Sequence, residues 1–346
     1  MDEILHDLVF YIYTPPWVDW SAGTKVLHYL CDSLNKNGWE SFLCIHGPRL
    51  NTEDVNKNLK TPVVSQEISN KHRSEGKRII VVYPEGIIGN PVGGDIIVRW
   101  ILNFPSLLGG KSSFLPGEIV WAYSKNIADA YVSSNKIKIP IMFIPAIKLS
   151  EIEASIEAPV VAGDYEVIYA QKYRALGGKP DLIPEHNLIE ITRFNRSSTT
   201  RSQTLNLIKH AKRVHIYENS SIASEAALFG VPVVCHKNVF FDSLISTDEL
   251  GEDGVSWHPY PGLPVNRDNS RRKLYESWHN LDANLLKCID QLPMNLSSEF
   301  EGKSLSIPHR RLASRHLIDR GSILIRQKGL RVFLRFASNY IKRWLR

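Results

Sequence analysis

The chain has 346 residues, of which 43% are hydrophobic and 23% charged, and its formal net charge is +6 at pH 7. This length predicts about two domains, and the composition excludes disordered, fibrous and collagen-like chains. The sequence contains no run of about 18 apolar residues, so no membrane-spanning helix is predicted.

Two features of the sequence predict the compartment. The first seven residues carry three acids, where a secretory signal would be basic, so no signal peptide is expected. The four cysteines are scattered, without C-x-x-C or zinc-like spacing, which favours buried thiols over disulfides or a metal centre. Both features are typical of a cytoplasmic protein.

The charge is distributed unevenly along the chain. Residues 303–346 contain twelve Lys or Arg and a single acid, Asp319, whereas acids outnumber bases in the rest of the chain. A basic segment on a mildly acidic body predicts an anionic partner for that segment, either a lipid surface or a nucleic acid.

The first half of the chain alternates apolar runs with segments of helical spacing. The run at residues 8–13 is rich in β-branched and aromatic residues and predicts a buried strand. The apolar spacing over residues 25–34 and over residues 95–104 predicts two helices. Further strands are expected at residues 41–45, 79–83, 119–123 and 139–144.

The alternation restarts after a polar stretch at residues 150–163, which we expect to link two domains. Strands are then expected at residues 166–170, 188–191, 214–217 and 232–235, and helices at 203–211 and 222–229. Continuous apolar strands separated by helices are typical of parallel sheets covered on both faces. We therefore predict two Rossmann-like, doubly wound α/β domains at residues 1–150 and 151–300, followed by a basic helical tail at 301–346.

The segment from His215 to His236 carries the most functional information, because it reads as strand, polar loop, helix, glycine and strand. A helix that begins at the carboxyl end of a parallel strand presents free N–H groups and a positive dipole end, which favour a bound diphosphate. Ser220 and Ser221 precede that helix. Glu225, about one turn inside it, is placed to accept hydrogen bonds from ribose hydroxyls.

The run EAALFGVPVV, which begins at Glu225, resembles the Glu-Ala-x-x-x-Gly-x-Pro-Val signature in the C-terminal domain of GT-B glycosyltransferases. The resemblance implies that Glu225 binds the donor ribose and that Ser220 and Ser221 line the diphosphate. Retaining members carry a paired acid eight positions earlier, which is Tyr217 here, one step from Glu218. Glu218 is therefore a candidate donor contact, and the stereochemistry stays open. The alternative is a generic helix–strand unit of an α/β protein.

Basic residues follow the strand predicted at residues 166–170. In GT-B members the loop after this strand carries cations for the donor diphosphate, and the resemblance implies that Lys172 and Arg174 have that role here. Arg193, just past the strand predicted at 188–191, is a weaker candidate of the same kind. Charge-assisted hydrogen bonds would hold the phosphates. The alternative is a solvated basic loop.

The loop after the first strand, TPPWVDWSAGT, is expected to face the acceptor, and the resemblance implies a small turn with a glycine, here Gly23, that opens a helix. Trp17 and Trp20 either stack on sugar faces or pack the loop. Asp19, in this loop, and Glu85, past the third strand, are the two candidates for a general base if the reaction inverts. The alternative for each is a structural carboxylate.

Glu85 also belongs to a YPE…GNP stretch, at residues 83–91. That stretch resembles part of the glycosyltransferases encoded in bacterial surface-polysaccharide clusters. The resemblance covers about 25 residues and is less specific than the one around Glu225.

Other chemistries have weaker signals in the sequence. No Asp-x-Asp occurs, so a metal-dependent GT-A site is not expected, and neither a metal nor another cofactor is predicted. His210 and His215 lack a partner spacing for zinc, and structural histidines are the favoured interpretation. There is no Gly-x-Ser-x-Gly elbow, and the glycine-rich residues 91–94 lack the Lys of a P-loop.

The C-terminal run LRVFLRFASNYIKRWLR has apolar residues on one helical face and basic residues on the other. This interfacial pattern predicts that residues 322–346 contact an anionic membrane surface. The alternative is a terminal helix that packs on the first domain after a crossover at residues 297–318. The lipid-like apolar face makes a nucleic-acid partner the less favoured reading, so none is expected.

The leading hypothesis is a glycosyltransferase that moves a sugar from a nucleotide-sugar donor to a glycan or glycolipid acceptor. By resemblance, the setting is O-antigen lipopolysaccharide or capsule synthesis, with the enzyme peripherally bound at the cytoplasmic face of the cell membrane. Two alternatives stay open. One is a nucleotide-sugar epimerase on the same fold, and the other is a non-catalytic scaffold whose basic tail binds nucleic acid.

Overall fold

A computed structural model of the chain describes residues 7–47, 54–104, 107, 113–148, 150–151, 163–181, 187–192, 200–260, 262–292 and 305–307. These residues group into two compact units. The first unit contains those up to Ile144 and those from Asn280 onward, and the second unit contains those from Pro145 to His279. Within the described ranges, the chain therefore returns to the first unit after the residues of the second.

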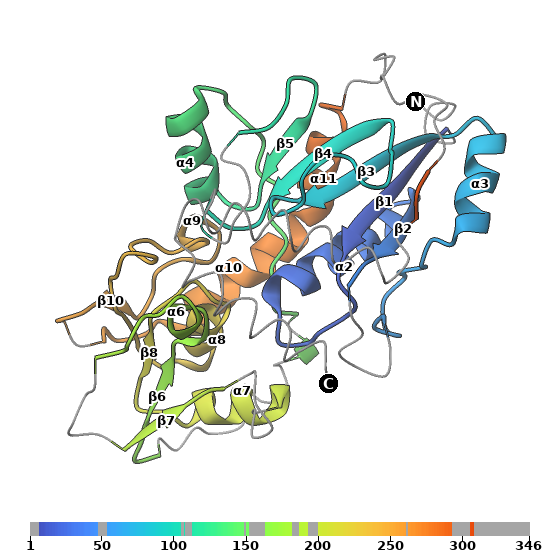
Figure 1. The fold of residues 1–346 in the computed structure, drawn as a ribbon. Helices are drawn as coiled ribbons and strands as arrows, with labels where there is room; N and C mark the ends of the chain where they lie inside the picture. The colour runs from blue at the N-terminus through green and yellow to red at the C-terminus, as the bar shows by residue number, and fades with distance from the viewer. Residues whose placement is uncertain are drawn as a thin grey trace. The chain divides into compact units, whose positions relative to one another are not determined.

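The first unit is built on a parallel sheet with five strands in the order β2-β1-β3-β4-β5 (Figure 1). Its strands are β1 (Leu8–Thr14), β2 (Glu40–Ile45), β3 (Arg78–Pro84), β4 (Ile96–Ile101) and β5 (Ile119–Ala122). All seven residues of β1 are buried, as expected for an interior strand covered on both faces. The apolar runs read from the sequence account for β1, β2, β3 and β5.

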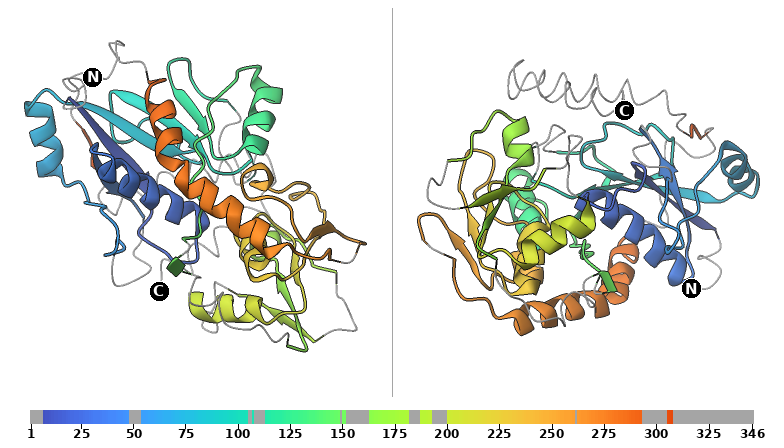
Figure 2. Two further views of the ribbon diagram at one scale, coloured as in Figure 1. Left: turned by 180° about the vertical axis from the view of Figure 1, so that it is seen from behind. Right: turned by 90° about the horizontal axis from the view of Figure 1, so that it is seen from below.

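The helices of the first unit come from distant parts of the chain. They are α2 (Ala22–Lys36), α3 (Gln66–Ser74), α4 (Lys125–Asn135) and α11 (Leu281–Ile289). Helices α2 and α11 lie side by side (Figure 2), and the side chain of Asn37, just past α2, donates a hydrogen bond of 2.8 Å to Asp282. Leu281, Leu285, Cys288 and Ile289 of α11 are buried. Helix α11 is thus part of the core of the first unit.

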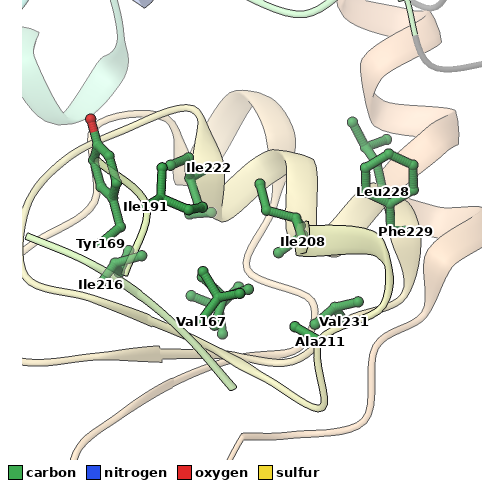
Figure 3. Packing of buried hydrophobic residues seen from close by; sticks show 14 of the residues in the cluster. Val167, Tyr169, Ile191, Ile208, Ala211, Ile216, Ile222, Leu228, Phe229 and Val231 are labelled. Atoms are coloured by element: carbon green, nitrogen blue, oxygen red, sulfur yellow. The ribbon is translucent and has the colours of Figure 1, made fainter. Parts of the chain in front are cut away.

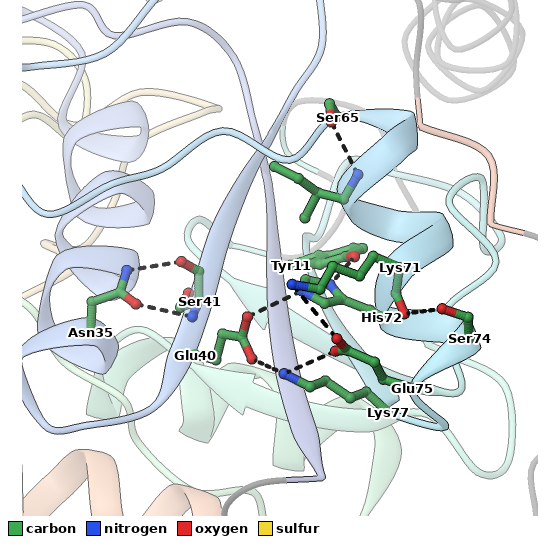
Figure 4. Close-up of polar contacts among 11 residues, drawn as sticks. Tyr11, Asn35, Glu40, Ser41, Ser65, Lys71, His72, Ser74, Glu75 and Lys77 are labelled. Atoms are coloured by element: carbon green, nitrogen blue, oxygen red, sulfur yellow. Dashed lines mark hydrogen bonds and ion pairs between the residues drawn. The ribbon is translucent and has the colours of Figure 1, made fainter.

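A polar network ties α3 to the first sheet (Figure 4). The hydroxyl of Tyr11 on β1 lies 2.7 Å from Nδ1 of His72 on α3, and Nε2 of His72 lies 3.1 Å from the carboxylate of Glu40 on β2. Lys77 forms an ion pair with the same carboxylate. Because Tyr11 and His72 are buried, these contacts fix α3 against β1 and β2.

The second unit repeats the architecture with a parallel sheet in the order β10-β9-β8-β6-β7. Its strands are β6 (Glu166–Tyr169), β7 (Leu188–Glu190), β8 (Val214–Ile216), β9 (Val233–Cys235) and β10 (Val255–Trp257). Its helices are α6 (Gln171–Ala175), α7 (Arg201–Lys209), α8 (Ile222–Phe229), α9 (Thr247–Leu250) and α10 (Arg267–His279). The bounds of α8 are those predicted from the sequence.

Helices α7 and α8 cover one face of the second sheet (Figure 3). Ile208 of α7 and Ile222 of α8 belong to one buried cluster with Val167 of β6 and Ile216 of β8. Each large aliphatic side chain buried in this way stabilises the fold by about 1.5–3 kcal/mol. Helix α8 ends at Gly230, whose φ of 79° is a left-handed conformation that glycine adopts without a steric penalty. This core holds the end of β8 and the start of α8 in place.

The helix predicted at residues 95–104 is wrong, because this segment contains the strand β4, paired in parallel with β3. The side chain of Asp95 accepts the N–H of Ile79 at 2.7 Å and pairs with Arg73 at 2.5 Å, which anchors the start of β4. The β-branched run Ile96–Val98 is stiff at χ1 and suits a buried strand better than a helix.

The strand predicted at residues 139–144 is also wrong, because only one isolated bridge forms there, between Ile141 and Ala122. The N–H of Ala122 donates to the carbonyl of Pro140, and the N–H of Met142 donates to the carbonyl of Ala122. Pro140 and Pro145 have no N–H to donate, so they interrupt the ladder on both sides of this short contact.

The two parallel five-stranded sheets confirm the predicted fold class of two Rossmann-like α/β domains. The predicted domains divide at residues 150 and 300, whereas the described residues divide after 144 and after 279. Most of the predicted linker, and the predicted membrane-binding segment 322–346, lie outside the described residues. Within the described ranges, none of the helices is both long enough and apolar enough to cross a bilayer.

Candidate functional site

The loop from β8 to α8 lies at the carboxyl edge of the second sheet, where the predicted diphosphate contacts are. Ser220 Oγ accepts the N–H of Ile222 at 3.3 Å. Ser221 occupies the N-cap position without a side-chain capping bond, and both serines are half-buried. The N–H groups of Ile222 and Ala223 donate to the Oγ atom and the carbonyl of Ser220, so the start of α8 presents mainly its positive dipole end at this edge.

Glu225 lies in the first turn of α8 and is almost fully buried, with 1% of its surface exposed. Its Oε1 atom pairs with Nη1 of Arg201 at 2.7 Å. Arg201 is the first residue of α7, and its guanidinium also lies 3.6 Å from Glu151. A buried ion pair thus joins the N-terminal turns of α7 and α8, and Arg201 holds the Glu225 carboxylate in one orientation.

Arg201 was not predicted as a site residue, although the sequence around it contains a signal for a helix start. Thr200 accepts the N–H of Gln203, and the Gln203 side chain accepts the N–H of Thr200, which is a capping box. A Thr followed three residues later by a Gln indicates a helix start. That pattern would have begun the helix at residue 201 and placed Arg201 at its N-terminus, near the carboxyl edge of the sheet.

Lys172 and Glu218 come together, although 46 residues separate them in the sequence. The Glu218 carboxylate accepts the backbone N–H groups of Lys172 and Tyr173, the latter at 2.9 Å, and so caps the short helix α6. The ammonium of Lys172 donates to the carbonyl of Asn219 at 2.9 Å and lies 4.0 Å from Glu218 Oε1. The predicted basic loop is therefore a helical turn, and it brings Lys172 to the loop that opens α8.

Arg174 takes a different direction from Lys172. Its guanidinium forms a bidentate pair with Glu190 at the end of β7, with Nε–Oε1 and Nη2–Oε2 distances of 2.7 and 2.9 Å. This pair is solvent-exposed and ties α6 to the edge strand. Arg193, the third predicted cation, lies outside the described residues. Of the predicted cations in the described ranges, Lys172 is the one at the loop before α8.

A column of four aromatic rings, which was not predicted from the sequence, runs along the same edge. Tyr173, Tyr217, His236 and His258 are successive members, with centroid separations of 5.5, 4.3 and 4.9 Å and interplanar angles of 16°, 13° and 17°. The last three follow directly on β8, β9 and β10. Gly178 makes room for the first ring, because a Cβ at that position would lie 2.2 Å from Tyr173.

The predicted acceptor loop of the first unit follows β1. Ser21 caps α2, and Gly23 lies in the first turn of that helix. The ring of Trp17 contacts the rings of His28 and Tyr29 at 5.3 and 5.9 Å, so Trp17 packs the loop against α2. Trp20 is half-buried, and Asp19 between the two tryptophans is exposed.

Glu85 lies past the end of β3 and is half-buried. Its Oε2 atom accepts the N–H of Leu102 at 3.0 Å, just past the end of β4. One carboxylate oxygen therefore joins the ends of two neighbouring strands. Asp19 and Glu85 stay predictions as general bases, and Asp19 is the more accessible of the two.

His28 secures the acceptor loop and makes stability depend on pH. Its ring is fully buried, and its Nε2 donates to the carbonyl of Pro15 at 3.1 Å. Burial lowers the pKa of His28 to about 4, and the hydrogen bond to Pro15 offsets this only in part. The unfolded chain therefore binds this proton first as the pH falls. The stabilisation is complete above about pH 6.5 and is lost as the pH falls towards 4.

We expect the free energy of unfolding to fall by about 2 kcal/mol on this account between pH 6.5 and 5. Urea denaturation at both pH values measures the loss, and His28→Leu should remove that part of the pH dependence. His279→Asn, at an exposed position, is the matched control and should leave the pH dependence as it is. An unchanged pH slope in His28→Leu would contradict the assignment to His28.

No family model and no curated protein matches the chain. Among solved structures, it is similar to an alpha-glucosyltransferase in complex with UDP and a 13-mer DNA containing a HMU base. That match has 11% identity, covers 86% of this chain and 97% of the other, and has a TM-score of 0.42.

Two further solved structures are similar at the same level. A proposed UDP-N-acetylglucosamine 2-epimerase from Listeria monocytogenes has 12% identity, covers 94% of this chain and 97% of its own, and has a TM-score of 0.40. The glycosyltransferase SnogD from Streptomyces nogalater has 11% identity, covers 82% and 98%, and has a TM-score of 0.34. At such identities and TM-scores these likenesses carry no argument about the activity of this chain.

Proposed function

We propose that the protein is a glycosyltransferase that uses a nucleoside-diphosphate sugar held at the carboxyl edge of the second sheet. The observation that carries the proposal is the position of Lys172, whose ammonium lies 2.9 Å from the carbonyl of Asn219 in the loop before α8. A cation beside a helix N-terminus is a favourable arrangement for a diphosphate, because charge-assisted bonds add to the helix dipole.

Ser220 and Ser221 then line the diphosphate, and Glu225 accepts hydrogen bonds from the ribose hydroxyls. The ion pair with Arg201 supports this role for Glu225, because it holds a buried carboxylate in one orientation. Glu218 acts indirectly, since its contacts cap α6 and position Lys172. Arg174 is engaged by Glu190 and is given no donor contact in this proposal.

In the transition state, the diphosphate leaves with developing negative charge. Lys172 and the α8 N-terminus are fixed before the reaction begins, so they stabilise that charge without reorganisation, and we propose that no metal is required. Asp19 is the proposed general base in the case of inversion, because it is exposed on the loop after β1.

The finer features of the function rest on the sequence alone. These are a lipid-linked glycan acceptor, surface-polysaccharide synthesis, attachment of residues 322–346 to an anionic membrane and a cytoplasmic location. Trp20 and Gly23 belong to the proposed acceptor loop. We propose these features together, because a basic interfacial segment suits an enzyme whose acceptor is anchored in lipid.

Thermal-shift measurements with nucleoside diphosphates and their sugar conjugates test the donor site. One nucleoside diphosphate at a hundred times its Kd should stabilise the protein by about 2.7 kcal/mol. Lys172→Met should weaken its binding by about ten- to a hundredfold, as expected for a lost charge-assisted bond. The matched control is Lys179→Met, at an exposed position on the same segment, which should bind like the parent.

Two results would change the proposal. If no nucleotide raises the melting temperature of the folded protein, it is not a nucleotide-sugar enzyme of this kind. That result would favour the alternative of a non-catalytic scaffold. If it binds a nucleotide sugar and interconverts it without an acceptor, the epimerase alternative is correct. EDTA treatment before the transfer assay checks the proposed independence from metal.

A further inference from the structure

A chain of three polar groups crosses the face of the second sheet that is opposite to α7 and α8. Oε1 of Glu166, on β6, forms an ion pair with Nε of Arg213 at 2.9 Å. Oε2 of Glu166 lies 2.8 Å from Nε2 of His215, on β8. Nδ1 of His215 lies 2.9 Å from Nε2 of His236, just past β9. Glu166, His215 and His236 are all nearly fully buried. We call Glu166, His215 and His236 the relay.

The relay fixes which ring nitrogens carry hydrogen. A carboxylate oxygen only accepts, so Nε2 of His215 is the donor to Glu166. Arg213 already balances the charge of Glu166, which favours a neutral His215 whose Nδ1 is then an acceptor. Nε2 of His236 must donate to that acceptor. A neutral His236 is left with a lone pair on Nδ1.

Burial keeps His236 neutral, stacking keeps its ring in place, and Nδ1 of the ring is left available to a ligand. Burial lowers the pKa of His236 to about 4, with further lowering by His215 and His258. The rings of Tyr217 and His258 stack on its two sides at 4.3 and 4.9 Å, so the ring cannot turn without breaking the column. Among the described residues, no hydrogen-bond partner is found for Nδ1 of this ring, which is 4% exposed.

The position of His236 relative to the proposed donor site indicates which part of the donor it would contact. His236 lies on the face of the sheet opposite to α8, but its ring stacks at 4.3 Å on the ring of Tyr217, the first residue of the loop that leads from β8 to α8. Glu225 and Arg201 mark the ribose side, towards α7 and away from β9. A diphosphate bound at Ser220 and Ser221 therefore has its nucleoside on the Arg201 side and its sugar on the β9 side.

We propose that Nδ1 of His236 accepts a hydrogen bond from a hydroxyl of the transferred sugar, and that Glu166 and His215 are positioning residues that hold His236 in the accepting tautomer. This inference rests on the proposed function. The inference adds the chemistry of the sugar subsite to the proposed function. The sugar group next to His236 is an uncharged hydrogen-bond donor. A carboxylate or phosphate in that place would direct lone pairs at a lone pair and would be rejected.

Two measurements on the full chain test the proposal. Long-range ¹H–¹⁵N spectra at pH 7.5 report the tautomer of each ring, and we expect hydrogen on Nε2 and none on Nδ1 for both His215 and His236. Calorimetry then compares the nucleoside diphosphate selected above with its sugar conjugate. His236→Phe keeps a ring in the column. It should weaken the affinity for the sugar conjugate by about tenfold and change the affinity for the diphosphate alone by less than about twofold.

Two variants separate positioning from packing. His215→Phe should leave His236 in the stack but let its ring populate the Nδ1–H tautomer, which the ¹⁵N shifts detect. The affinity for the sugar conjugate should then fall about as much as in His236→Phe. His236→Asn, whose amide oxygen can take the place of Nδ1, should recover part of that affinity. If His215→Phe does not fold, the spectra of the unmodified protein still decide the tautomer.

Each contrary outcome is distinct. Hydrogen on Nδ1 of His236, or a doubly protonated His215 at pH 7.5, overturns the relay. Equal losses for the diphosphate and its sugar conjugate in His236→Phe, or no loss for either, overturn the sugar contact while the proposed function stands. If no nucleotide binds the unmodified protein, the proposed function fails, and the inference fails with it.

Discussion

Glu118→Ala should destabilise the first unit by about 3–5 kcal/mol, because it leaves a buried guanidinium without its carboxylate. Arg99 on β4 is 1% exposed, and its Nη2 pairs with Glu118 at 2.5 Å. Its Nη1 donates to the carbonyl of Ile87 at 2.8 Å, and a further bond to Gly89 ties the loop after β3 to the sheet. Urea unfolding of the variant and the parent measures the difference.

The matched control is Asp129→Ala, which removes the exposed pair between Asp129 and Lys125 on α4. That pair has a similar length, 2.6 Å, but is solvated, so its loss should cost less than about 1 kcal/mol. Similar costs for Glu118→Ala and Asp129→Ala would show that Arg99 relaxes to solvent. In that case the loop at residues 85–92 is not held as described.

Arg201→Met should have a comparably large effect on the second unit, again about 3–5 kcal/mol, because it removes the cation beside the buried Glu225. Arg174→Met is the control, since the Arg174–Glu190 pair is bidentate but exposed and should contribute about 1 kcal/mol or less. Both variants are compared with the parent by urea unfolding.

A second substitution separates stability from binding in the same pair. In Arg201→Met/Glu225→Leu, the buried charge is gone, so much of the lost stability should return. Nucleotide binding should not return, because the proposed ribose contact is absent. A double variant that regains stability and still binds the nucleotide with parental affinity would remove Glu225 from the donor site.

The sequence predicted the segments whose two ends carry clear signals. Helix α8 has a polar loop ending in Ser221 before it and Gly230 after it, and both bounds agree with the structure. Strand β1 reads as an uninterrupted apolar run because it is buried on both faces.

The helix expected at residues 95–104 shows where periodicity alone fails. Ile97, Ile101 and Phe104 have helical spacing, but short apolar runs are ambiguous between helix and strand. The β-branched composition of Ile96–Val98 was the stronger signal, and it agrees with β4.

The contacts at the candidate site were beyond sequence reasoning, because they depend on how strands are ordered. The sequence marked Lys172, Glu218 and Glu225 separately. It gave no sign that Glu218 caps α6 and directs Lys172 to the loop before α8. The relay could not be predicted from the sequence for the same reason. Glu166 lies on β6 and His236 lies just past β9, and His215 of β8 is between them in the sheet.

The return of the chain to the first unit has a consequence for biosynthesis. Helix α11 supplies buried Leu281 and Leu285 to the first unit, yet it follows all the described residues of the second unit in the sequence. A nascent chain emerging from the ribosome therefore has an unfinished first unit until the second has been made. At about 5–20 residues per second this delay is on the order of ten seconds, during which the surface that α11 covers is open to chaperones.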